Sequence, residues 1–316
     1  MPTISPRGIR VLIDAKRIAE SISDEDSKGR ALVMIAEALA TTDSDRAEGI
    51  ARSITQEAMK AKALAAVAGA LAATDPDRAD RLFADADSIA GSISDQGWKA
   101  IALASVAAGL AVTDPGRAAW LIADAEGIAH SLYSEGAQAG TLEAIVVVLA
   151  ATATDEAERI ALSIDWESRK ANALIAVAGA LAATDPDRAE RIARSISSKR
   201  EKVRAMTEVA RVVAGSDQDR AVRLIAYADN IIEAETYRDS VSYMLIGLAG
   251  ALAAIDPDRA EREVQYINDE RQKCRALAGV AGVLAAIDPD RAERIAQSIT
   301  INPSKVAALV AVAEAL

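Results

Sequence analysis

Histidine and cysteine, which carry much of enzyme chemistry, each occur once in this chain, as His130 and Cys274. One imidazole and one thiol are too few for a conventional zinc site, which takes three or four such ligands. They also give no basis for a Ser-His-Asp or Cys-His catalytic set. No glycine-rich phosphate loop follows a strand pattern. We therefore expect no enzyme activity, no catalytic residue, no metal site and no cofactor.

The acidic pattern Asp-x-Asp recurs along the chain, and paired carboxylates of this kind could bind Ca²⁺ or Mg²⁺. The clearest copies are Asp75/Asp77, Asp185/Asp187, Asp256/Asp258 and Asp288/Asp290. In each copy a proline separates the two aspartates. This order suits a helix start, with the first Asp as N-cap, Pro at the first helical position and the second Asp in the positive first turn. Capping accounts for every copy, so we interpret the pattern as a helix start.

These helix starts belong to an internal repeat with spacings of 32 and 39 residues. The repeated string is Ala-Thr-Asp-Pro-Asp-Arg-Ala, intact or altered, and its first Asp is the anchor of each copy. The anchors are Asp43, Asp75, Asp114, Asp185, Asp217, Asp256 and Asp288, with Ala153 in a degenerate copy and Ile4 as the extrapolated first. The spacings differ by 7 residues (39 minus 32), which is two helical turns, so a lengthened helix keeps the same buried face.

Each copy of the repeat predicts two helices. After the anchor Asp185, apolar residues such as Ala189, Ile192 and Ile196 recur at helical spacing and predict an amphipathic helix. The segment from Arg169 to Ala183 before that anchor is almost wholly apolar. A helix that is apolar all round is buried between neighbours, so we expect it to form the inner layer. Its many alanines would let the helices approach closely.

The copies at Ala63–Ile93, Ala173–Ile196 and Ala276–Ile299 resemble the helical hairpins of the tetratricopeptide and HEAT repeat superfamily. The chain lacks the Trp, Leu-Gly, Tyr and Pro spacing of the tetratricopeptide consensus. The resemblance implies an all-α fold, a right-handed superhelical α-solenoid of about nine helical hairpins that spans residues 1–316 as a single domain. It further implies a scaffold that binds a protein or peptide, with no catalytic residues to carry over.

Comparison of the copies separates packing positions from variable ones in the apolar helix. Counted back from the anchor, positions 13, 10, 9 and 6 vary and fall on one stripe of the helix. Repeat proteins present a continuous concave surface from such equivalent positions. The stripe is mostly small and apolar, but its centre carries Glu143, Asn172, Arg204, Glu208 and Arg211. This centre is interpreted either as ordinary solvated residues or as a groove that recognises a polar or charged group.

Glycine recurs at position 6 of the stripe, as at Gly69 and Gly179. A helical glycine costs about 1 kcal/mol relative to alanine. Its recurrence predicts close approach of a neighbouring helix or of a ligand.

The aromatic residues fall mainly in the 39-residue copies. Trp98, Trp120 and Tyr243 belong to the long copies, whereas Trp166 lies in a short one. Longer helices overhang and need bulky side chains to cover them, which is one explanation. Alternatively, these rings form the walls of a binding site, since Trp and Tyr are enriched at binding hot spots. Trp120 replaces the solvent-facing Arg of other copies, so the periodicity predicts an exposed indole.

Composition and charge exclude several classes of partner. The chain is 51% hydrophobic but only 3% aromatic, and 73 of its 316 residues are alanine. The formal net charge of −11 argues against nucleic acid, and no basic amphipathic helix favours an anionic membrane surface. The apolar runs reach about 13 residues, against about 20 needed to span a bilayer. With one cysteine and no signal-peptide pattern, we expect a cytoplasmic protein.

The last helix, from Lys305 to Leu316, repeats the internal pattern, and its apolar side is expected to be uncovered. A partner, further residues or a second copy of the chain would cover it, which makes homo-oligomerisation an open expectation. The leading hypothesis is a non-enzymatic scaffold that binds a protein or peptide along the variable stripe. The alternative is a protein that binds or sequesters a bulky hydrophobic or aromatic small molecule through the aromatic-bearing long repeats.

Overall fold

The computed structural model describes residues 6–315, apart from the side chains of Pro6 and Arg238, and this part of the chain is entirely helical. It has 18 helices and no strand within the described residues, which confirms the predicted all-α class. The odd-numbered helices follow the anchors: α1 (Pro6–Glu20), α3 (Ser44–Ser53), α5 (Pro76–Ser92), α7 (Pro115–His130), α9 (Thr154–Ser163), α11 (Pro186–Ser195), α13 (Gln218–Glu233), α15 (Pro257–Gln265) and α17 (Pro289–Ser298). The even-numbered helices precede them: α2 (Glu25–Leu39), α4 (Glu57–Leu71), α6 (Gln96–Leu110), α8 (Glu135–Leu149), α10 (Glu167–Leu181), α12 (Lys199–Val213), α14 (Arg238–Leu252), α16 (Glu270–Leu284) and α18 (Asn302–Ala315).

The helices divide into two compact units. Unit 1 comprises residues 20–177, which include α2 to α9 and most of α10. Unit 2 comprises residues 178–315 together with residues 6–19, so it contains α11 to α18 and nearly all of α1. The assignment of residues 1–316 to a single repeat domain stays a prediction.

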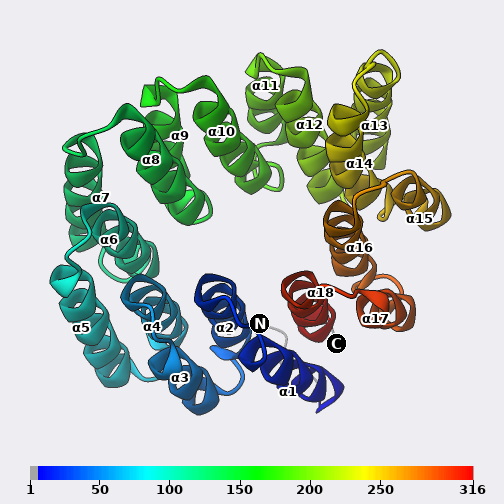
Figure 1. Cartoon of the computed structure of the whole chain (residues 1–316). Coiled ribbons are helices and arrows are strands. Elements are labelled where there is room, and N and C mark those ends of the chain that lie inside the picture. Colours follow the sequence, from blue (N-terminus) through cyan, green and yellow to red (C-terminus); the bar gives the residue numbers. More distant parts are fainter. Residues whose placement is uncertain (1–5, 316) are drawn as a thin grey trace. The chain divides into compact units, whose positions relative to one another are not determined.

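Within each unit, successive even-numbered helices pack side by side as one layer, and each contacts its odd-numbered partner in a second layer (Figure 1). The even-numbered helices are buried between neighbours. In α4, for example, Ala61, Ala63, Ala65, Val67 and Ala68 have no exposed surface. The high alanine content of the sequence therefore allows the close packing of this layer.

Every anchor aspartate within the described residues caps its helix as predicted. The Asp185 carboxylate accepts a hydrogen bond of 3.0 Å from the backbone N–H of Arg188, and the other six Asp anchors bond in the same way. Ala153 occupies the cap position of α9 and has no side-chain acceptor to offer. The seven-residue difference between copies lies in the odd-numbered helices: α5, α7 and α13 have 17, 16 and 16 residues, whereas α3, α11 and α17 have 10 each.

Ion pairs link several odd-numbered helices to the odd-numbered helix of the preceding copy. Arg78, three residues after its anchor, binds Asp45 and Glu48 of the preceding copy at 2.7 Å each. The same link recurs between Arg220 and Asp187 and between Arg291 and the pair Asp258 and Glu261. These side chains are partly exposed, so each pair contributes up to about 1 kcal/mol.

Helix α1 makes the same kind of ion pair with a helix at the other end of the sequence. Arg7 lies three residues after the extrapolated anchor, and it binds Asp290 and Glu293 of α17 at 2.6 and 2.8 Å. These partners occupy the same positions as the partners of Arg78 in their own copy. In α18, Val306, Leu309 and Val312 are buried. Residues 306–313 of α18 are all buried or half-buried, so the expectation that the last helix leaves an apolar side uncovered is wrong. Arg7 joins α1 to α17 within the same unit.

Candidate binding surfaces

A groove of about 660 Å³ lies across α4, α6 and α8 of unit 1, near their C-terminal ends. Its lining is mostly alanine, glycine and valine, with few polar side chains. The lining residues are Glu37, Lys62, Ala66, Gly69, Ala72, Ala73, Ser105, Ala108, Gly109, Val112, Thr113, Val147, Val148 and Thr152. Several of them, at positions 9 and 6, belong to the variable stripe predicted from the sequence.

Two glycines let the helices below this groove touch through their backbones. A Cβ added at Gly109 would lie 2.7 Å from the carbonyl oxygen of Ala65, and one added at Gly69 would lie 3.1 Å from the carbonyl oxygen of Gly109. At position 6, the neighbouring helix explains Gly69, as one of the two sequence interpretations proposed, whereas Gly250 at the same position has nothing within 4 Å of an added Cβ. Gly109 is at position 5 and was not part of that interpretation. Because small residues form the floor, open space remains above them.

The walls of the groove are apolar and exposed. Val112 keeps 89% of its surface exposed and Val147 keeps 56%. The hydroxyls of Ser105 and Thr113 donate to the carbonyl oxygens of Ile101 and Leu110, respectively, within their own helix or at its end. These two hydroxyls thus already have partners, and the exposed surface of the valine walls is hydrocarbon.

One end of the groove carries a charge pair. The Lys62 ammonium lies 3.4 Å from the Glu37 carboxylate, and both side chains are about 40% exposed (42% and 38%). An exposed pair of this kind adds little stability. It gives this end of the groove one donor and one acceptor group for a ligand.

The predicted polar centre of the stripe is divided between the two units. In unit 1, Glu143 binds Arg169 at 2.8 Å and is largely buried, and Asn172 is half-buried. In unit 2, Glu208 binds Arg211 at 2.5 Å, and Arg204 is half-buried. The hydrogen bond to Glu208 raises the pKa of Arg211.

The stripe itself needs one correction. Position 10 is buried in several copies, including Ala65, Ala104 and Thr207, and so does not contribute to the accessible surface there. Positions 13, 9 and 6 are mostly half-buried or exposed. The error arose because residues that vary in size can still pack inside when their neighbours compensate.

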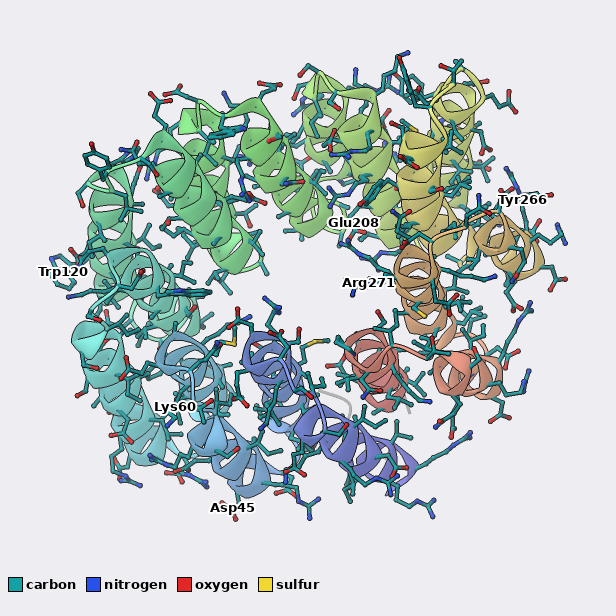
Figure 2. The ribbon with its side chains drawn as sticks, in the orientation of Figure 1. Asp45, Lys60, Trp120, Glu208, Tyr266 and Arg271 are labelled. Atoms are coloured by element: carbon teal, nitrogen blue, oxygen red, sulfur yellow. The ribbon has the colours of Figure 1, made fainter. Side chains whose placement is uncertain are left out.

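All four predicted aromatic candidates are exposed, but they line different places. Trp120 projects from α7 on the side away from α6, with 66% of its surface exposed, as predicted (Figure 2). Trp98 lies in the first turn of α6. Tyr243 lies on α14 and stacks under the Arg200 guanidinium, 5.3 Å from the ring centre.

Trp166 lines a smaller cleft of about 330 Å³ at the edge of unit 1. His130, Glu135 and Asp165 line it too. The aromatic ring of Trp166 lies over Gly136, where an added Cβ would come within 3.1 Å of it. This cleft combines an indole face with two carboxylates, which suits a cationic or aromatic amine.

The single cysteine and the single histidine each lie close to a side chain of the protein itself. Cys274 is buried, with its Sγ 3.4 Å from the Thr300 hydroxyl. His130 is half exposed, and its Nε2 lies 3.8 Å from Glu126. Within residues 6–315, no group of three or more His, Cys, Asp or Glu side chains could hold a metal ion. None of the described helices is long and apolar enough to cross a membrane.

Sequence reasoning missed three residues of the groove: Val112 and Thr152, which follow the ends of α6 and α8, and Val148, which lies in the last turn of α8. Val112 and Thr152 were outside the stripe because the helical period was followed only to position 6, and Val148 is at position 5, which is not one of the variable positions. A signal was present: position 2 before the anchor is alanine in most copies, whereas the copy anchored at Asp114 holds Val112 there.

No protein-family model matches this chain. No curated protein matches it either. Among solved structures, the chain is similar to the crystal structure of Ton1535 from Thermococcus onnurineus NA1, with 18% sequence identity over 93% of each chain and a TM-score of 0.38. A likeness at this level carries no argument about function, and membership of a tetratricopeptide or HEAT family is not shown.

Proposed function

We propose that this chain is a non-enzymatic binding scaffold and that the groove across α4, α6 and α8 takes an apolar segment of a partner protein. The observation that carries the proposal is the groove itself, about 660 Å³ with walls of exposed valine. Exposed apolar surface of this kind is typical of interaction sites. None of the described residues that line it is aromatic, so the groove favours the apolar side chains of a peptide over an aromatic small molecule.

The chemistry of the lining also selects the conformation of the segment. An extended peptide needs partners for its backbone N–H and C=O groups. The hydroxyls of Ser105 and Thr113 are already bonded within the protein. An α-helix satisfies its own backbone, and its apolar face can lie in a groove with anchors at i, i+3, i+4 and i+7. We therefore infer an amphipathic helix as the occupant.

Selection from a displayed library of random 16-residue peptides tests this function. Peptides selected on the wild-type chain should share the i, i+3, i+4, i+7 apolar spacing. The double variant Val112→Asp/Val147→Asp should weaken their binding by about 100-fold, since each valine buried in the complex is worth about 1.5 kcal/mol. Both side chains are exposed, so the variant should fold normally.

The matched control is Leu162→Asp/Val222→Asp, which places the same charges on exposed apolar positions of α9 and α13. This control should leave binding within about twofold. Selected peptides without the helical spacing, or equal binding to both double variants, would contradict the proposal.

A second candidate function rests on the cleft beside Trp166. Its indole face and the carboxylates of Glu135 and Asp165 favour an aromatic amine. In a Trp98→Phe/Trp120→Phe background, Trp166 is the sole reporter, and quenching of its fluorescence by tyramine or a similar amine would support this function. Unchanged fluorescence across such a panel would eliminate it.

A further inference from the structure

Two helices of unit 2, α12 and α16, carry pairs of arginines at equivalent positions, and Tyr243 lies between them on α14. Position 13 before the anchor holds Arg204 on α12, Tyr243 on α14 and Arg275 on α16, and these helices pack side by side. One turn earlier, position 17 holds Arg200 on α12 and Arg271 on α16. Figure 2 shows Arg271 on the side of α16 away from α15 and α17. The four arginines and Tyr243 are called the arginine patch below.

The patch differs from the same positions in unit 1. There, position 13 holds Arg30 on α2 and Lys62 on α4 but Ile101 on α6 and Gly140 on α8, and position 17 of these four helices holds Asp26, Ala58, Gly97 and Gly136. The whole chain has a formal net charge of −11. Arginine at both positions 13 and 17 thus occurs on α12 and α16 and on none of α2, α4, α6 and α8.

Two members of the patch have no internal role in the part of the chain that is described. Arg271 and Arg275 are exposed and take part in no ion pair or hydrogen bond among those residues. Arg200 pairs with Glu201 at 2.6 Å and stacks over Tyr243, which fixes its guanidinium. Asp239, at position 17 of α14, is an exposed carboxylate.

The placement of Arg200 and Arg271 does not serve helix stability. Both lie in the first turn of their helices, where the positive end of the helix dipole disfavours cations. Arginines in the first turn of both α12 and α16 are therefore explained better by a ligand than by the fold.

We propose that the arginine patch binds an acidic peptide segment of a partner protein, with the guanidinium groups of Arg271 and Arg275 pairing with its carboxylates. Arginine presents a planar fork that matches a carboxylate. A long phosphate backbone is disfavoured because the negative net charge of the protein repels it along its whole length. A short acidic segment contacts only the arginine patch. This surface is independent of the apolar groove and of the function proposed for it.

Fluorescence anisotropy with a labelled octaglutamate peptide tests the patch. Wild-type chain should bind it at low ionic strength and lose affinity as salt rises, because the contacts are exposed charges. Arg271→Gln/Arg275→Gln should weaken binding by about tenfold, the upper range for two exposed ion pairs.

The matched control is Arg191→Gln/Arg223→Gln, two exposed arginines on α11 and α13 of the same unit. It makes the same change in net charge and should alter binding by less than about twofold. Equal loss in both variants would show general attraction and overturn the proposal, as would failure of the wild-type chain to bind. Tighter binding of a labelled oligothymidylate than of the peptide would assign the patch to nucleic acid instead.

Discussion

Substitution of aspartate for Ala153 should stabilise the start of α9. Ala153 has φ −137° and ψ 59°, close to the φ −140° and ψ 74° of the capping Asp185. The backbone is thus already shaped for a cap, and only the acceptor oxygen is missing. An Asp at this position should accept from the backbone N–H of Glu156, as Asp185 accepts from Arg188.

The gain follows from N-cap measurements, in which an Asp in place of Ala is worth about 1 kcal/mol. Asp155 and Glu156 stand in the same first turn and will repel the new carboxylate by a few tenths of a kcal/mol. A net gain of about 0.5–1 kcal/mol remains, which slows local opening by about two- to fivefold.

Hydrogen exchange measured by mass spectrometry over residues 150–164 checks this prediction. Ala153→Asp should slow exchange in α9 and leave α11 unchanged. Asp185→Ala is the reverse control and should speed exchange in α11 by about fivefold. If Asp185→Ala speeds exchange in α11 as expected but Ala153→Asp leaves exchange in α9 unchanged, the missing cap at Ala153 does not limit the stability of α9.

Three further predictions concern packing and charge. Arg7→Gln should speed hydrogen exchange across α1, whereas Arg10→Gln, which changes an exposed arginine of that helix, should not. Equal exchange rates in the two variants would show that the ion pairs of Arg7 with α17 do not stabilise α1. Burial raises the pKa of Glu48, but hydrogen bonds from its two arginine partners outweigh this and leave the pKa lowered. Its stabilisation is therefore present above the ordinary carboxyl range and lost as pH falls through the lowered pKa, so Glu48→Gln should flatten the decline of urea stability below about pH 4. Gly109→Ala should lower the free energy of unfolding by about 1–3 kcal/mol through overpacking, while Gly127→Ala, with open space around it, should raise it by up to about 1 kcal/mol in thermal or urea unfolding.

The helices could be predicted because each local signal is repeated. Asp185, Pro186 and the apolar run before them specify a helix end, a cap and a helix start within a few residues. Seven-residue insertions preserve the buried face, so a lengthened helix could be predicted in the 39-residue copies, and the structure identified it as the odd-numbered one.

The position of α1 could not be predicted in this way. Chain order places it before α2, but its ion-pair partners on α17 lie nearly three hundred residues later. The extrapolated anchor, Ile4, is not an aspartate, so the sequence signal that marks the other copies is weak there. Arg7 does lie three residues after this anchor, the position that makes the ion pairs in other copies, but only the structure identified its partners as Asp290 and Glu293.

The groove was predicted in part. Positions 9 and 6 of the stripe do line it, including Ala66, Gly69 and Val147. Its depth depends on how closely α4 and α6 approach at Gly109, and helix spacing is a tertiary property that a single helix period does not contain. The aromatic residues, taken from the sequence as one candidate set, lie in separate places.

Methyl NMR of valine-labelled protein tests the central claim most directly. A helical peptide selected on the wild-type chain should shift the methyl signals of Val112, Val147 and Val148, which line the groove. The signals of Val222, exposed on α13 of unit 2, should stay in place. Shifts confined to the groove valines are the predicted result. Unshifted groove valines in the presence of saturating peptide would contradict the account.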